Sequence, residues 1–327
     1  VVGAASTVVA ITVLSPAKPE VSSSEPARRS GLLDFDWVGT ALSAALLLTS
    51  MLAVTFAMDL GWSSPFIVGG FASSAILFAA FILWERRRPA PMLPLSLFRS
   101  AAFSIGSAAR FVSFMGGSST FFLMPFFLVA GLGLTTAEAA LYLMPAAATM
   151  TVFGPLSGRI ADKIGPRIPA VVGMSLSTIS MYLFSLVSLD TRPVMIAVAS
   201  GLSGMGMSIF MAPNTSLILG SAARQNYGIV SAFLNLTRNT AHIIGIAIPT
   251  AVVVAVMSSL GYEADLSDPE KLKDIELRAA YASAMARAFQ VSVVMMLVAA
   301  VLALVAPSST RKAADEEAKA PAQATSR

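Results

Sequence analysis

Uninterrupted apolar runs recur along the 327 residues of this chain, and their length limits what the chain can fold into. Eight of these runs can each cross a hydrocarbon layer about 30 Å thick, namely residues 37–58, 66–84, 101–129, 137–157, 168–189, 193–219, 228–258 and 284–306. Hydrophobic residues make up 56% of the chain and charged residues 12%. A soluble protein would have to bury several entirely apolar helices in one core. The sequence therefore predicts an all-α, polytopic helical membrane protein.

The composition excludes several kinds of functional site. The chain has no cysteine and one histidine, so disulfides, thiolate metal sites and histidine metal clusters are not expected. The apolar runs contain no paired acid and base of the kind an enzyme needs, and no Walker motif for ATP occurs. We therefore expect no enzyme, no metal and no cofactor. The modest net charge of +4 gives no reason to expect a nucleic-acid partner.

Polar segments divide the chain into five parts. In order, these are a remnant of a spanning helix (1–14), a Pro- and Ser-rich cytoplasmic linker (15–33), a helix pair with a basic loop (34–100), a block of six spans (101–306) and a disordered tail (307–327). Asp36 immediately precedes the first complete span, where a carboxylate suits the positive end of the helix dipole. The run from Ser267 to Glu270 predicts a helix start. The opening VVGAASTVVA has no initiator Met and no basic segment, so we expect a fragment of a longer protein.

The distribution of Lys and Arg predicts which loops face the cytoplasm. If 15–33 lies inside and the spans alternate, fifteen of the 22 basic residues fall in inside segments, five in outside segments and two within spans. Such a bias is usual for cytoplasmic loops, so we expect 158–167 and the C-terminus to be cytoplasmic and the protein to lie in the plasma membrane. The inside set is Lys18, Arg28, Arg29, Arg86, Arg87, Arg88, Arg99, Arg159, Lys163, Arg167, Arg224, Arg311, Lys312, Lys319 and Arg327, the outside set is Arg192, Lys271, Lys273, Arg278 and Arg287, and the spans hold Arg110 and Arg238.

The stretch GRIADKIGPR, from Gly158 to Arg167, places four charges between two apolar runs. It resembles the signature loop of the major facilitator superfamily of secondary transporters, in the copy found in the second half of these proteins. The segment from Asp36 to Gly39 resembles the extra helix pair of the fourteen-spanner drug:proton antiporter family, and Gly228 to Asn239 resembles its penultimate helix. This resemblance implies that residues 101–306 form the C-terminal six-helix half and that the N-terminal half is missing.

The residue types in this stretch suit a tight reversal between two helices. Glycines permit close helix approach or a positive φ, and a carboxylate can accept hydrogen bonds from the free amides of the next helix, near Ile168. The bases can hold the loop in the cytoplasm. The resemblance implies a conformational latch, and the alternative is a solvated basic turn. The candidate latch residues are Gly158, Arg159, Asp162, Lys163, Gly165 and Arg167.

Arg238 lies inside an apolar run, roughly 15 Å from its start and therefore near the middle of the bilayer. A charge at that depth costs at least about 2.5 kcal/mol and usually faces a cavity or a partner. Asn235, Asn239 and His242 lie three or four positions from it or from one another, so they share its face. This face is predicted to line the path of substrate or proton, and the alternative is a hydrogen-bonded cluster between helices. His242 could carry a proton near neutral pH or serve only in packing.

Three further polar residues are candidates for the same path. Arg110 lies about 14 Å into its span and would line the cavity or extend to the inner surface. Glu138 starts a span on the outer side, where the helix dipole alone explains a carboxylate. Asn214 follows Pro213 at a predicted helix break, where amides can bind substrate or pack the cytoplasmic end. The 17 Met and 19 Phe suit either a promiscuous apolar pocket or a lipid-facing surface.

Together with the resemblance, these features predict a proton-coupled exporter of amphipathic or cationic small molecules that works by alternating access. Its expected partners are the small-molecule substrate, protons, the lipid bilayer and the missing N-terminal half of the same chain. One alternative is an exporter of a specific metabolite, such as an amino acid or a siderophore. Another is a membrane scaffold or sensor that transports nothing.

Overall fold

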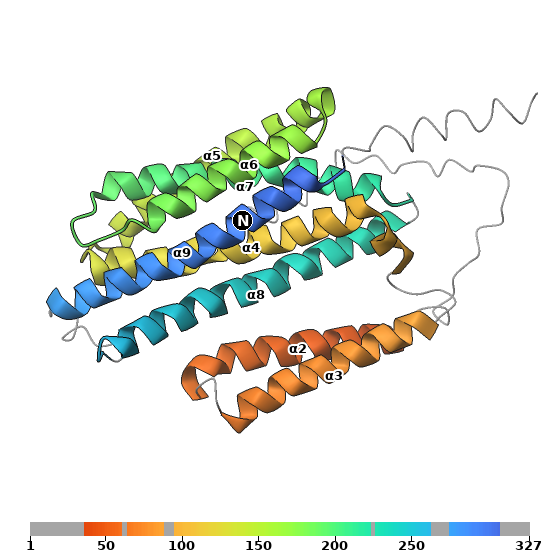
Figure 1. Ribbon diagram of the computed structural model, residues 1–327, viewed down its shortest axis with the longest axis horizontal. Coiled ribbons are helices and arrows are strands. Elements are labelled where there is room, and N and C mark those ends of the chain that lie inside the picture. Colours follow the sequence, from red (N-terminus) through yellow and green to blue (C-terminus); the bar gives the residue numbers. More distant parts are fainter. Residues whose placement is uncertain (1–35, 61–63, 88–94, 224–225, 263–274, 308–327) are drawn as a thin grey trace, which may run out of the picture. The chain divides into compact units, whose positions relative to one another are not determined.

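All regular structure in the described part of the chain is helical, which confirms the predicted fold class. The computed structural model describes residues 36–60, 64–87, 95–223, 226–262 and 275–307. Within these ranges seven helices are long and apolar enough to cross a membrane, and α2 contains a shorter apolar stretch, Trp37–Ala53. The helices, shown in Figure 1, are α2 (Trp37–Leu60), α3 (Pro65–Arg87), α4 (Ala101–Phe126), α5 (Thr136–Ile164), α6 (Arg167–Phe184), α7 (Pro193–Gly220), α8 (Tyr227–Ser259) and α9 (Ile275–Val305).

Helices α4 to α9 form a bundle in which neighbours in space are often distant in sequence. Helix α5 packs on α7, α6 packs on both α7 and α9, and α4 packs on α8 and α9. Figure 1 shows these six helices running along a shared direction. The first helix of the bundle therefore lies against the last two, which places residues more than a hundred positions apart in one site.

Small residues at the contacts allow the helix backbones to approach closely. A Cβ atom on Gly173 of α6 would lie 2.6 Å from the carbonyl oxygen of Gly206 on α7. Hydroxyls bridge other pairs, since Ser180 Oγ donates to the Ala199 carbonyl at 2.7 Å. Without a hydrophobic driving force between helices in lipid, close packing of this kind and interhelical hydrogen bonds hold such bundles together.

Helices α2 and α3 pack against each other by the same means. Ser74 Oγ of α3 donates to Thr49 Oγ1 of α2 at 3.0 Å. A Cβ atom on Gly70 would lie 2.9 Å from the Cβ of Ala53, so the pair approaches closely at that point. The predicted helix start immediately after Asp36 agrees with the start of α2 at Trp37.

Several predicted helix limits were wrong. Helix α5 continues to Ile164, so most of the stretch 158–167 is helical and the reversal is confined to Gly165 and Pro166. Helix α6 ends at Phe184, five residues before the predicted limit, and α9 is already helical at Ile275 rather than 284. Charged and Ala-rich segments were taken for loops, although Lys, Arg and Ala are good helix formers. The predicted helix start at 267–270 and the segments 1–33 and 308–327 lie outside the described residues.

Proline has different effects in two of these helices. Helix α7 runs unbroken through Pro213, so the break predicted there was wrong. In α4, Pro125 is followed by a short π-helical segment, η2 (Phe127–Gly131). The proline ring of Pro125 does not fit a regular helical interior, and the wider π-helical turn follows it.

Candidate functional site

A cavity of about 380 Å³ lies inside the six-helix bundle, and every helix from α4 to α9 contributes to its wall. Small-molecule sites commonly have volumes of about 300–1,000 Å³. Its apolar wall consists of thioethers and aromatic rings, and its polar wall contains serines, an arginine and the single histidine. The lining residues are Phe114, Gly117, Phe121, Met150, Ser177, Ser203, Gly204, Met207, Met211, Arg238, His242 and Met296.

A second, more open space of about 800 Å³ shares Met150 and Met211 with this cavity. Its wall comes from α5 and α7 and from Tyr227 at the start of α8. It extends to Gly220, the last residue of α7. The open space therefore lies next to the inner cavity and reaches the end of the bundle at which α7 ends and α8 begins.

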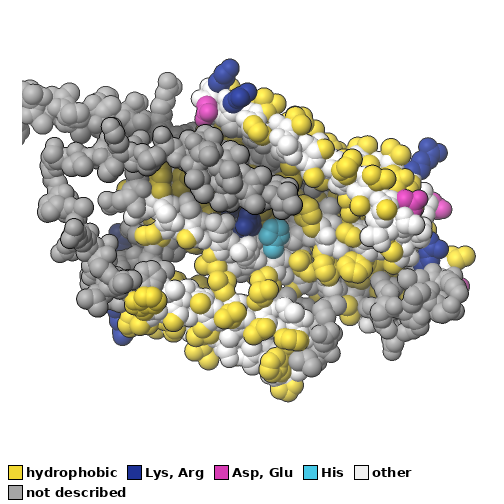
Figure 2. All heavy atoms as spheres, turned by 180° about the vertical axis from the view of Figure 1, so that it is seen from behind, with side chains coloured by type: hydrophobic (Ala, Val, Ile, Leu, Met, Phe, Trp, Pro, Cys, Tyr) yellow, Lys and Arg dark blue, Asp and Glu magenta, His cyan; other side chains and the backbone are white. Residues whose placement is uncertain are grey.

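Arg238 and His242 project from one face of α8 into the inner cavity. Arg238 is exposed and His242 is half-buried. Figure 2 shows a basic side chain directly beside the histidine. The midpoint of α8 falls at Ile243, so Arg238 lies roughly 7 Å toward its N-terminus and remains deep within the apolar span.

Ser118 of α4 holds the ring of His242. Ser118 Oγ donates to the Phe114 carbonyl at 2.6 Å, and the same oxygen lies 2.6 Å from His242 Nδ1. A hydroxyl has one proton to donate. With that proton on the Phe114 carbonyl, Nδ1 of the histidine is the donor to Ser118. Nε2 is then the ring nitrogen that remains for a proton or a ligand.

Arg110 of α4 lies behind the cavity wall rather than at the membrane surface. Its side chain is only 6% exposed, and its Nη1 donates to Thr215 Oγ1 of α7 at 3.0 Å. The guanidinium carbon stands 5.3 Å from the centre of the Phe114 ring, within range of a cation–π contact. This geometry favours the cavity position over extension to the inner surface. Phe114 faces the inner cavity and Thr215 the open space.

On the described helices α4 to α9, the charges inside the bundle are all positive. Arg238 interacts electrostatically with both Arg110 and His242, and both interactions are repulsive when the histidine carries its proton. Carboxylates in helices α4 to α9 occur only near helix ends, at Glu138, Asp162 and Glu276. Each arginine at such depth costs at least about 2.5 kcal/mol on insertion scales. The bundle therefore carries two costly cations without an acidic residue of its own beside them.

The remaining members of the predicted polar face lie away from the cavity wall. Asn235 Nδ2 donates to the Ser231 carbonyl of its own helix at 3.1 Å, and Asn235 and Asn239 are both exposed.

Glu138 forms a capping box with Thr135, whose backbone amide donates to Glu138 Oε2 at 2.9 Å. This contact accounts for the carboxylate at the start of α5 by helix capping.

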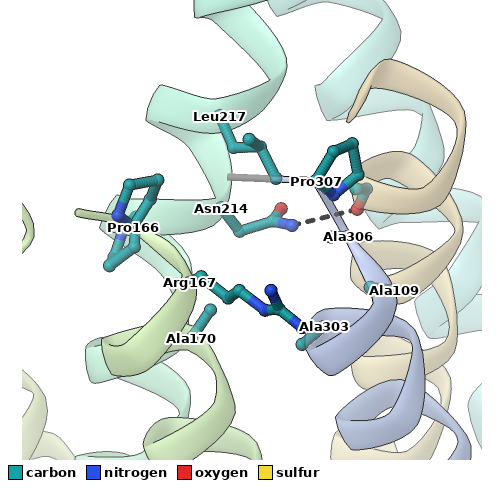
Figure 3. A pocket seen from close by; sticks show the side chains of 11 residues that line it. Ala109, Pro166, Arg167, Ala170, Asn214, Leu217, Ala303, Ala306 and Pro307 are labelled. Carbon is teal, nitrogen blue, oxygen red and sulfur yellow. Dashed lines mark hydrogen bonds between the residues drawn. The ribbon is translucent and has the colours of Figure 1, made fainter. Parts of the chain in front are cut away.

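Asn214 lines a small separate pocket between α4, α6, α7 and α9. It is 3% exposed, and its Nδ2 donates to the Gly106 carbonyl at 3.0 Å. Figure 3 shows this bond and the side chain of Arg167, which extends across the pocket toward Ala303. The position favours packing at this end of the bundle over contact with a ligand in the main cavity.

The family model for the Major Facilitator Superfamily matches residues 24–246, more than half of the chain. The chain belongs to this superfamily. It is therefore a multi-pass membrane protein of a transporter family, and this membership confirms the coarser part of the resemblance. The fourteen-spanner subfamily stays a prediction.

Two relatives of this facilitator chain are named for drug resistance. This chain is 28% identical over 261 residues to the tetracenomycin C resistance and export protein of Streptomyces glaucescens, and the alignment covers 79% of this chain and 46% of the relative. It is 26% identical over 240 residues to the multidrug resistance protein Stp of Mycobacterium tuberculosis, covering 73% of this chain and 44% of the relative. The chain thus spans less than half the length of these relatives.

A solved structure supports the fold. A bacterial homologue of the human lysosomal transporter Spinster, in an inward-facing and unoccupied conformation, aligns with a TM-score of 0.52 at 19% identity. The alignment covers 83% of this chain and 68% of that structure. At this identity the likeness concerns the arrangement of helices alone.

The candidate latch of this facilitator chain has only part of the predicted geometry. Gly165 has a φ of 86°, as expected for a reversal that only glycine adopts readily. Gly158 lies within α5, and a Cβ atom there would meet nothing within 4 Å, so neither close approach nor a positive φ explains it. The start of α6 has no side-chain cap, so the predicted capping by Asp162 was wrong. Within α5, the side chains of Arg159, Asp162 and Lys163 make no hydrogen bond or ion pair with another described residue.

Several residues of the site were not anticipated from the sequence. Phe114 lies four positions from Arg110, a spacing that could have indicated the cation–π contact. Ser118 and Thr215 give no such signal, because their partners lie on other helices. The methionines at 150, 207, 211 and 296 support the pocket interpretation of the Met-rich composition.

Proposed function

We propose that this chain is the C-terminal part of a fourteen-spanner major facilitator exporter that moves amphipathic small molecules across the plasma membrane. The observation that carries the proposal is the cavity inside the bundle, which combines a Met- and Phe-lined wall with Arg238 and His242. Flexible thioethers adapt to ligands of different shape. The names of two relatives, one an export protein and one a multidrug resistance protein, support the same function.

In this proposal the inner cavity and the adjoining open space form the entry path for substrate on the cytoplasmic side of the alternating cycle. The open space ends where α7 gives way to α8, and the loop there is cytoplasmic in the topology that the Lys and Arg distribution favours. Substrate would enter from the cytoplasm or inner leaflet, and a rocking motion against an N-terminal half would open the cavity to the other side. The C-terminus is cytoplasmic in this arrangement.

Proton coupling is part of the proposal, with His242 as the candidate carrier on this chain. Its Nδ1 is engaged by Ser118, and its Nε2 remains for a proton. The conformational latch is proposed at the α5–α6 reversal, where Gly165 sets the turn and three bases and Asp162 lie close together in sequence.

Efflux from cells that express the full-length gene product tests this function. A panel of cationic, neutral and anionic amphipathic dyes would be loaded with and without a protonophore. We expect export of several dyes, loss of export with the protonophore, and loss in Arg238→Ala but not in Arg287→Ala. Arg287 is an exposed arginine of α9 outside the cavity, so it controls for the loss of one positive charge.

Other outcomes of the same assay separate the alternatives. Export of one metabolite and none of the dyes would favour a specific exporter. Wild-type export by Arg238→Ala would contradict a role of this cavity in transport. An absence of any export would favour a scaffold or sensor.

A further inference from the structure

We propose that the inner cavity binds the anionic group of an amphipathic ligand, a carboxylate or a sulfonate, at Arg238. The inference rests on the proposed function, because it takes the cavity as the substrate site. It narrows the substrate class from the amphipathic or cationic molecules expected from the sequence to amphipathic anions.

The first step is the state of Arg238. Its guanidinium lines the cavity, and the described residues offer it no hydrogen bond or ion pair. Guanidinium groups present five donors in a planar fork that matches a carboxylate or a sulfonate. An arginine that served only to tie helices together would be expected to donate to a neighbouring helix within the bundle. Arg238 has its donors available on the cavity side instead.

The second step concerns Arg110, the other cation near the cavity. It is buried, its Nη1 is bound to Thr215, and its Nε has no partner among the described residues. The Phe114 ring that it contacts also faces the cavity. Arg110 therefore adds fixed positive charge behind the wall, where low polarity strengthens its attraction for an anion.

The third step is the absence of a competing acid on the bundle helices. The only carboxylates in α4 to α9 are Glu138, Asp162 and Glu276, near the helix ends. A cationic ligand in this cavity would meet two like charges and no carboxylate from these helices. An anionic ligand would relieve the repulsion between the arginines as it binds.

The fourth step is the apolar remainder of the wall. Phe121, Met207 and Met296 line the same cavity as Arg238, so a bound molecule would meet charge and apolar surface together. The cavity of about 380 Å³ accommodates a fused aromatic ring system with a short acidic arm. The wall thus fits an aromatic or aliphatic body attached to one acidic group.

Two fluorescent probes of the same ring system and opposite charge test the inference directly. Dansylglycine carries a carboxylate and dansylcadaverine an ammonium at neutral pH. Binding of each would be measured by fluorescence to the full-length protein in nanodiscs, with empty nanodiscs subtracted. We expect dansylglycine to bind the wild type more tightly than dansylcadaverine. We expect Arg238→Gln to weaken dansylglycine by about tenfold to a hundredfold, the range for a lost charge-assisted hydrogen bond.

Matched variants separate charge from folding. Arg238→Lys keeps the positive charge and should retain part of the preference for dansylglycine. Arg287→Gln removes an exposed arginine outside the cavity and should bind both probes like the wild type. If Arg238→Gln fails to fold, the lysine variant and the salt dependence of wild-type binding still decide, since added NaCl should weaken only the anionic probe.

Two results would overturn the inference. One is equal or tighter binding of dansylcadaverine, the result expected if a carboxylate from elsewhere in the protein occupies Arg238. The other is unchanged dansylglycine affinity in a folded Arg238→Gln protein. An efflux assay separates the anion site from the proposed transport function. A protein that binds dansylglycine through Arg238 but exports nothing would refute transport and leave the anion site standing. Export without charge preference would refute the anion site alone.

Discussion

The contact between α6 and α7 gives the sharpest stability prediction, through Gly206. An added Cβ at this position would lie 2.5 Å from Ser177 Oγ and 2.6 Å from both the Gly173 carbonyl oxygen and the Ser177 amide nitrogen. Two of the three atoms belong to the backbone and cannot rotate away. Because carbon–oxygen contacts are normally at least about 3.3 Å, Gly206→Ala requires the two helices to separate by roughly 0.7 Å.

The expected loss in free energy of unfolding for Gly206→Ala has two parts of opposite sign. Overpacking by a methyl group typically costs about 1–3 kcal/mol. Alanine recovers about 0.5–1 kcal/mol relative to glycine within a helix. The net loss in free energy of unfolding should therefore lie between about 0 and 2.5 kcal/mol. The cavity should also change shape, since Ser177 on α6 and Ser203 on α7 both line it.

A glycine without close neighbours supplies the matched control. Gly158 lies within α5, and a Cβ atom there would meet nothing within 4 Å. Gly158→Ala should therefore raise the free energy of unfolding by up to about 1 kcal/mol, with the opposite sign to Gly206→Ala. Titration with sodium dodecyl sulfate in mixed micelles, followed by circular dichroism, measures both. A Gly206→Ala protein more stable than the wild type, or shifts of equal sign and size in the two variants, would refute the steric argument.

Three further substitutions can be measured by the same unfolding titration. Thr135→Ala removes the capping box with Glu138 and should cost about 1 kcal/mol, whereas an unchanged midpoint would contradict its role in starting α5. Gly165→Ala places a side chain at φ 86° and ψ 160° and should cost about 1–3 kcal/mol, so equal stability would show that the reversal relaxes. Arg278→Ala removes two donors to the Gly131 carbonyl at the end of η2 and should cost about 1.5–3 kcal/mol, a loss that Arg278→Lys should restore only in part.

The sequence predicted the number and order of the described helices because spanning segments are set by length and hydropathy. It misplaced helix ends where a helix continues beyond the apolar run. The last turns of α5, through Asp162 and Lys163, are charged yet helical, so hydropathy marks where the membrane could end rather than where the helix ends. The reversal itself was predictable, since Gly165 and Pro166 are residues that helices do not continue through easily.

The sequence indicated the charged residues near the cavity but not the uncharged partners that they contact. Arg238 and His242 were candidates because they are isolated polar residues in an apolar run, four positions apart, and both line the inner cavity. Asn235 and Asn239 fall on the same broad face by spacing, yet the cavity wall includes neither. The partners Ser118 and Thr215 come from other helices, and spacing along one helix carries no information about such contacts.

Several helices of the bundle are joined by hydrogen bonds between uncharged groups. Ser119 and Ser292 meet at 2.7 Å between α4 and α9, and Ser157 donates to the Ser208 carbonyl at 3.2 Å between α5 and α7. Hydroxyls of this kind hold helices together in lipid at a much lower desolvation cost than a guanidinium. A cation retained at Arg238 without a partner among the described residues is therefore not needed for packing. Its cost is best accounted for by the anionic ligand that we propose for the cavity, and for this reason an Arg238→Gln protein should remain folded while it loses that ligand.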